Sequence, residues 1–105
     1  MKQNRKNIIL EEINNEPSNP FNYYLLGLEN IKEGNREEVT NIFERLIINH
    51  SNYLPSYLTY SIFLIENNIK LKQAEELLLK GIEIAKLQSN NKAQSELQAL
   101  LDIHF

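Results

Sequence analysis

The chain repeats its own residue pattern with a period of 34 to 35 residues. Superimposed on itself, the sequence aligns Tyr23 with Tyr57 at a spacing of 34, and Val39 with Ala74 at a spacing of 35. A fixed period of this size is typical of stacked helical arrays, in which each repeat is one supersecondary unit. The change in spacing places one extra residue in the second repeat, within the stretch ENNIKLK.

The spacing of apolar residues predicts that both halves of each repeat are helices. Apolar residues recur at steps of three and four, as in Val39, Ile42, Phe43 and Leu46, which is the pattern of an amphipathic helix. No stretch alternates for long enough to predict a strand. Stretches rich in helix breakers, such as NEPSNP and EGN, separate the periodic segments. We therefore predict an all-α chain with helices near 3–15, 20–33, 36–49, 54–67, 70–87 and 91–103.

Several helix ends carry capping signals. Asn19 and the proline after it are typical of an N-cap followed by the first helical position. Asn35 with Glu38 three residues later predicts a capping box. Gly34 is expected to end its helix in the left-handed conformation, and Pro55 is expected to open the next helix.

Gly27 lies inside an apolar run that otherwise reads as a helix, YYLLGLENIK. Glycine in a helix interior costs about 1 kcal/mol relative to alanine. We expect it where two helices cross so closely that a larger side chain would separate them. Ser61, which aligns with Gly27, and Ala74 are expected to do the same in the second repeat, and Gly81 to admit the following helix.

Composition excludes several classes of protein. The 105 residues predict one domain. The chain has no cysteine, which excludes disulfides, thiolate zinc sites and cysteine nucleophiles. The net charge of −3 disfavours a nucleic-acid partner, because such proteins usually carry a basic patch. The apolar stretch Ile8–Leu10 is too short for a signal peptide or a membrane span, so we expect a cytoplasmic protein with no membrane partner.

No pattern of residues indicates catalysis. The only histidines are His50 and His104, and nothing in the sequence brings them together. Adjacent glutamates on a helix do not face each other, and phosphate-binding, nucleophile-elbow and metalloprotease motifs are absent. We predict that the protein is not an enzyme and holds neither a metal nor a cofactor.

The repeat resembles the tetratricopeptide repeat, and the chain is similar to small proteins of that family of the bacterial type. Leu26-Gly27 stands at the family's Leu-Gly pair and Gly34-Asn35 at its turn, whereas Asn30 replaces the second aromatic residue and Ser51 the closing proline. The resemblance implies a half-repeat over 3–19, repeats over 20–53 and 54–88, and a polar-backed capping helix over 89–105. It assigns packing between helices to Tyr23, Leu26, Gly27, Val39, Phe43, Tyr57, Tyr60, Ser61, Ala74, Leu78 and Gly81.

The resemblance also implies a right-handed superhelical stack of antiparallel helix pairs whose first helices line a concave groove. The groove positions carried over are Phe21, Tyr24, Leu28, Ile31 and Lys32 in the first repeat, and Leu58, Thr59, Ile62, Ile65 and Glu66 in the second.

This groove is mostly apolar. It therefore suits a peptide or helix of another protein better than the acidic chaperone tails that some family members bind through Lys, Arg and Asn. Two further occupants stay open: a second copy of the chain, related by a two-fold axis, and the C-terminal helix itself. We expect a protein–protein interaction scaffold. The alternatives are a homo-oligomerisation module and, disfavoured by the acidic charge, an RNA-binding helical repeat.

Overall fold

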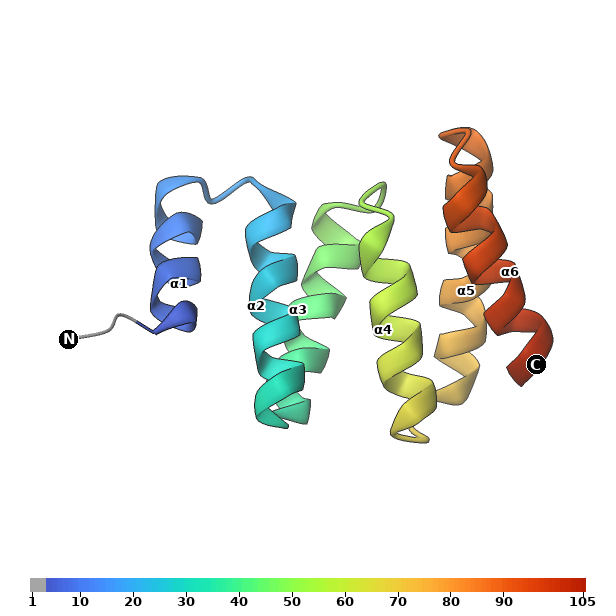
Figure 1. Cartoon of the computed structure of the whole chain (residues 1–105), viewed down its shortest axis with the longest axis horizontal. Helices are drawn as coiled ribbons and strands as arrows, with labels where there is room; N and C mark the ends of the chain where they lie inside the picture. The colour runs from blue at the N-terminus through green and yellow to red at the C-terminus, as the bar shows by residue number, and fades with distance from the viewer. Residues whose placement is uncertain (1–3) are drawn as a thin grey trace. The chain divides into compact units, whose positions relative to one another are not determined.

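The computed structural model describes residues 4–105, and these form six α-helices without a strand (Figure 1). Each helix begins and ends within two residues of its predicted bounds, so the all-α prediction is confirmed for this part of the chain. The first residue of the predicted helix 3–15 lies outside the described residues. The helices are α1 (Arg5–Asn15), α2 (Pro20–Glu33), α3 (Arg36–Asn49), α4 (Pro55–Glu66), α5 (Leu71–Leu87) and α6 (Asn91–His104).

The chain divides into two compact units, residues 1–51 and 52–105. The division falls two residues before the expected boundary between the repeats at 53 and 54. Unit 1 holds α1 to α3 and unit 2 holds α4 to α6. Each unit is a set of three helices.

In unit 1, α2 is the central helix and packs against both α1 and α3. In unit 2, α5 is central and packs against both α4 and α6. Because the connections are short, consecutive helices within a unit run antiparallel (Figure 1). The apolar cores comprise Ile9, Val39, Ile42, Phe43 and Leu46 in unit 1, and Leu54, Tyr57, Tyr60, Phe63, Leu64, Ala74, Leu77, Leu78, Ile82, Ile84, Ala85 and Leu97 in unit 2.

Gly27 marks a close approach of α2 to α3. A Cβ atom added there would lie 2.7 Å from Cε2 and 2.8 Å from Cζ of Phe43. Phe43 is fully buried, and its ring meets the Tyr24 ring edge-on with the centroids 6.1 Å apart. Since that ring is held on several sides, even one methyl group on Gly27 would force the Phe43 ring or the helices to move.

Gly81 marks a close approach of helices in unit 2, on the central helix α5. A Cβ atom there would lie 3.0 Å from Cβ of Tyr57 in α4 and 3.1 Å from Cδ1 of Leu97 in α6. Ser61 of α4 is also fully buried, and its hydroxyl donates to the Leu58 carbonyl oxygen at 2.9 Å. Small residues therefore lie where the helices of unit 2 pack most closely.

Three helices, α2, α4 and α5, end in the same hydrogen-bonded motif. Gly34 directly follows α2, whereas Asn68 and Ser89 lie two residues beyond the last residues of α4 and α5, and their φ values are 75°, 54° and 54°. After α2, Gly34 N–H donates to the Ile31 carbonyl at 3.1 Å and Asn35 N–H to the Asn30 carbonyl at 3.0 Å. This pair of bonds defines the Schellman motif, and it recurs after α4 and α5. The left-handed cap predicted at Gly34 is confirmed.

The capping box predicted at Asn35 is wrong. Asn35 does precede α3, but its side chain makes no capping hydrogen bond. A capping box also requires the Glu38 side chain to accept from the Asn35 N–H. That N–H already donates to the Asn30 carbonyl of α2, because only two residues join the helices. The N-cap predicted at Asn19 is confirmed, since its side chain accepts from the Phe21 N–H at 3.0 Å.

Candidate functional site

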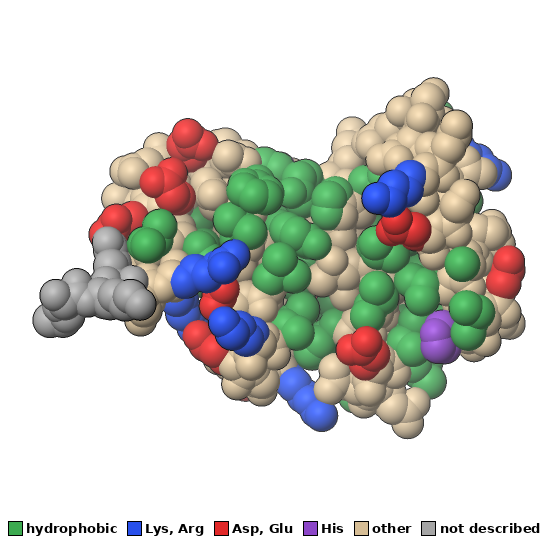
Figure 2. All heavy atoms as spheres, viewed as in Figure 1, with side chains coloured by type: hydrophobic (Ala, Val, Ile, Leu, Met, Phe, Trp, Pro, Cys, Tyr) green, Lys and Arg blue, Asp and Glu red, His purple; other side chains and the backbone are tan. Residues whose placement is uncertain are grey.

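The predicted groove residues of unit 1 all lie on α2. Phe21 is 50% exposed and Leu28 is 36% exposed, whereas Tyr24 and Ile31 are partly buried. Their spacing places them along one side of the helix, and apolar side chains gather over α2 in Figure 2. We call Phe21, Tyr24, Leu28 and Ile31 the α2 stripe. Lys32, also predicted for the groove, is exposed at the end of the same helix.

The predicted groove residues of unit 2 all lie on α4 and are less exposed. Leu58, Thr59, Ile62 and Ile65 are partly buried, and only Glu66 is exposed. The most accessible apolar side chains among the ten predicted positions are therefore Phe21 and Leu28 of the α2 stripe.

Most of the residues assigned to packing between helices are buried. In unit 1 these are Gly27, Val39 and Phe43. In unit 2 they are Tyr57, Tyr60, Ser61, Ala74, Leu78 and Gly81. Tyr23 and Leu26 differ, because both are only partly buried and line a cleft.

This cleft, of about 330 Å³, lies among α1, α2 and α3 of unit 1 and was not predicted. We call it the unit 1 cleft. All three helices contribute side chains to its lining. Tyr23 closes one part of the wall, where its hydroxyl donates to the Pro17 carbonyl at 2.6 Å. The remaining lining has an apolar part, formed by Leu10, Ile13, Leu26, Ile42 and Leu46, and a polar part, formed by Glu38, Arg45, Asn49 and His50.

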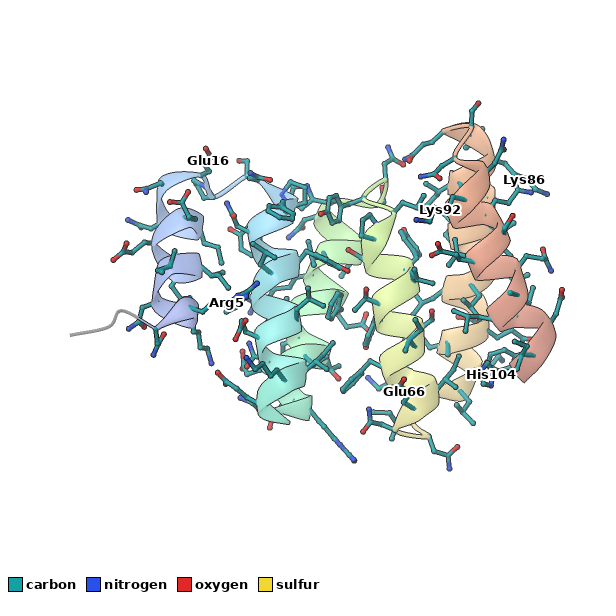
Figure 3. The ribbon with its side chains drawn as sticks, viewed as in Figure 1. Arg5, Glu16, Glu66, Lys86, Lys92 and His104 are labelled. Atoms are coloured by element: carbon teal, nitrogen blue, oxygen red, sulfur yellow. The ribbon has the colours of Figure 1, made fainter. Side chains whose placement is uncertain are left out.

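The cations of unit 1 differ in their partners. Arg5 of α1 extends toward α2 (Figure 3), where its Nε lies 2.9 Å from a carboxylate oxygen of Glu29. Lys6 similarly lies 3.0 Å from Glu33. Arg45, in contrast, is exposed at the cleft and forms no ion pair with any residue in 4–105. The two paired cations attach α1 to α2, whereas the guanidinium of Arg45 is available to a ligand.

The described residues contain no metal-binding arrangement. Among residues 4–105, no three acidic or histidine side chains are grouped so that they could hold a metal ion. His50 lies at the unit 1 cleft, and His104 is in the last turn of α6 in unit 2. Burial raises the pKa of the hydroxyl of Tyr57, a core residue of unit 2. None of the helices in this part of the chain is both long enough and apolar enough to span a membrane.

Comparison with known proteins identified no relative. No protein-family model, no curated protein and no solved structure matches this chain. Its function must therefore be inferred from the geometry of its own residues.

Proposed function

We propose that this chain is a tetratricopeptide-like scaffold for protein–protein interaction, and that the α2 stripe receives an apolar peptide or amphipathic helix of another protein. The observation that carries the proposal is the exposure of Phe21 and Leu28 on the central helix of unit 1. A single exposed apolar residue is ordinary on a protein surface. Two large ones in line on a helix, flanked by Tyr24 and Ile31, form a continuous apolar surface that a partner helix can cover.

The internal repeat supports the family assignment. The helical hairpins α2–α3 and α4–α5 share a buried small residue in the first helix, Gly27 or Ser61. They also share a Schellman end, at Gly34 or Asn68. A right-handed superhelical stack of antiparallel helix pairs belongs to this proposal. So do a cytoplasmic location and the lack of catalytic activity.

Aromatic residues make the stripe suitable as a binding anchor. Phe and Tyr bury a large area with few rotatable bonds, and a small number of such residues carries most of the energy of an interface. The stripe presents Phe21 at the start of α2 and Leu28 two turns later. A partner helix with apolar residues at i, i+3 or i+4, and i+7 would match this spacing.

A selection experiment tests the proposal. A library of displayed amphipathic helical peptides is selected on the whole chain, and the enriched peptides are measured by fluorescence anisotropy. We expect enriched peptides with apolar residues at the spacing above. Phe21→Ser should weaken their binding by about tenfold or more, as expected for loss of an interface anchor.

Leu79→Ser is the matched control, because Leu79 is also half exposed but lies on α5 in unit 2. The Leu79→Ser variant should bind the enriched peptides as tightly as the parent chain does. The proposal is wrong if selection enriches no helical peptide, or if the enriched peptides bind Phe21→Ser as tightly as the parent.

The alternative is a homo-oligomerisation module. In that case the α2 stripe of one copy covers the same stripe of a second copy across a two-fold axis. The two functions use the same residues but differ in the solution mass of the protein.

A further inference from the structure

The unit 1 cleft combines an apolar floor with a cation, Arg45, that forms no ion pair with any residue in 4–105. We infer that it binds a medium-chain aliphatic monocarboxylate, with the carboxylate at Arg45 and the chain against the floor. This inference is independent of the α2 stripe, because Leu28 and the other stripe residues do not line the cleft.

The size of the cleft favours a small ligand. Its volume of about 330 Å³ lies at the lower end of the range for ligand sites, roughly 300–1,000 Å³. Its floor is formed by the side chains of Ile13, Leu26 and Ile42, with Leu46 beside them, and Leu10 is still 45% exposed at its edge. An aliphatic chain would cover this apolar surface. Each methylene that it buries should tighten binding by up to about fourfold.

The charges of the cleft are separated along α3. Arg45, Asn49 and His50 line it near the C-terminal end of α3, and Glu38 lines it near the N-terminal end. Residues 38 and 45 are seven positions apart, which corresponds to about 10 Å along a helix. A ligand of this length can place its charged end at Arg45 and leave Glu38 in solvent.

Arginine is the group that selects the charged end of the ligand. Its planar guanidinium matches a carboxylate with two parallel hydrogen bonds. Arg45 forms no ion pair within residues 4–105, so a ligand carboxylate would not have to displace a protein carboxylate. The Asn49 amide, beside it on the lining, can also donate to an anion.

Glu38 restricts the other end of the ligand. A second carboxylate at the far end of the chain would either lie on the apolar floor, at a desolvation cost, or approach the like charge of Glu38. The cleft is therefore expected to prefer a monocarboxylate over the dicarboxylate of the same length.

The experiment uses octanoate as the probe and the whole chain as the receptor. Binding is followed by chemical-shift changes of the backbone amides, with octanol, acetate and octanedioate as comparison ligands. We expect saturable octanoate binding with shifts among the residues of the cleft. We also expect binding weaker by about fivefold or more for octanol, which lacks the charge, for acetate, which lacks the chain, and for octanedioate.

Two substitutions on the same helix separate the role of Arg45 from general charge. Arg45→Gln should weaken the binding of octanoate by about tenfold, as expected for the loss of a charge-assisted bidentate contact. Arg36→Gln removes an equal charge from an exposed position that does not line the cleft and should leave binding unchanged.

The inference is overturned if octanoate does not saturate the protein by about 10 mM, a concentration at which a ligand with a Kd of about 1 mM would fill most of the sites. It is also overturned if octanol or octanedioate binds the parent chain as well as octanoate does, or if Arg45→Gln binds like the parent. Circular dichroism establishes that each variant is folded. Should Arg45→Gln unfold, the comparison of the four ligands on the parent chain decides the matter.

Discussion

The hairpin α2–α3 of unit 1 and the hairpin α4–α5 of unit 2 end their first helix in the same way but begin their second helix differently. Gly34 and Asn68, which are 34 residues apart, both adopt positive φ and complete a Schellman motif. After that point unit 1 needs only Asn35 before α3 begins. Unit 2 inserts one more residue and reaches α5 through Lys70, whose φ is 47°.

This difference explains why the repeat period changes from 34 to 35 within one turn. The bonds that end the first helix are backbone bonds, so they persist when the side chain at the cap changes from glycine to asparagine. The extra residue is placed after the cap, where a second left-handed residue redirects the chain. An insertion at this point leaves the packing positions of both helices unchanged, because Ala74 is buried as Val39 is.

The largest expected effect comes from filling the contact between α2 and α3. Gly27→Leu should lower the free energy of unfolding by about 1–3 kcal/mol or more, because the added side chain overlaps the buried Phe43 ring. Urea denaturation measures this change. Lys32→Leu, an exposed position on the same helix, is the control and should stay within about 0.5 kcal/mol of the parent. An unchanged melting temperature for Gly27→Leu would refute the close packing and the repeat assignment.

Adding a single methyl group at each of the two glycine contacts should destabilise unit 1 more than unit 2. Gly27→Ala should cost about 1–2 kcal/mol, because the new Cβ would lie 2.7 Å from an aromatic ring. Gly81→Ala should change stability by less than about 1 kcal/mol. Its contacts of 3.0–3.3 Å are less severe and are offset by the better helix propensity of alanine. Thermal unfolding of both variants measures these changes. Equal destabilisation by Gly27→Ala and Gly81→Ala would show that the two glycine contacts are equally tight.

The caps provide the next comparison, at about 1 kcal/mol or less. Gly34→Ala should destabilise by about 1 kcal/mol, because alanine is strained at a φ of 75°. Ser89→Gly should stabilise by about 0.5–1 kcal/mol, since it removes the same strain. Asn68→Gly should gain less, because asparagine tolerates the left-handed region. The denaturant midpoints of the three variants measure these changes. If side-chain contacts rather than backbone strain determine the stability of the caps, Ser89→Gly will not stabilise more than Asn68→Gly.

The smallest effect is expected at the ion pair between α1 and α2. Arg5→Gln should cost no more than about 1 kcal/mol, because Arg5 is exposed although Glu29 is largely buried. The loss should shrink further at high salt, where exposed charges are screened. Thermal unfolding of the parent and the variant at two salt concentrations measures both effects, and a difference that does not depend on salt would exclude an electrostatic origin.

The sequence was sufficient to predict the helices because local signals agree along the chain. Apolar periodicity, Asn19 before a proline and Pro55 each mark the helices independently of tertiary structure. Gly27 could be interpreted because a glycine inside a strong helix requires a compensating packing advantage. These features depend on residues that lie within a few turns of one another.

Other features depend on the arrangement of three helices and could not be predicted from sequence. Asn35 carried a capping signal, but its N–H is taken by the end of the preceding helix. Ser89 carries no sequence signal for its left-handed conformation, and Asn68 carries only a weak one, because asparagine tolerates that region more readily than most residues. Arg45 stands between Ile42 and Leu46 in the sequence, and only the packing of α1 and α3 against α2 places it at a cleft.

The most direct test of the proposed scaffold is the solution mass of the chain, measured by light scattering across a wide range of concentrations. We expect a monomer of 12.3 kDa, with the α2 stripe open to another protein. A mass twice that value that returns to the monomer in Phe21→Ser, but not in Leu79→Ser, would contradict it. That result would assign the stripe to self-association.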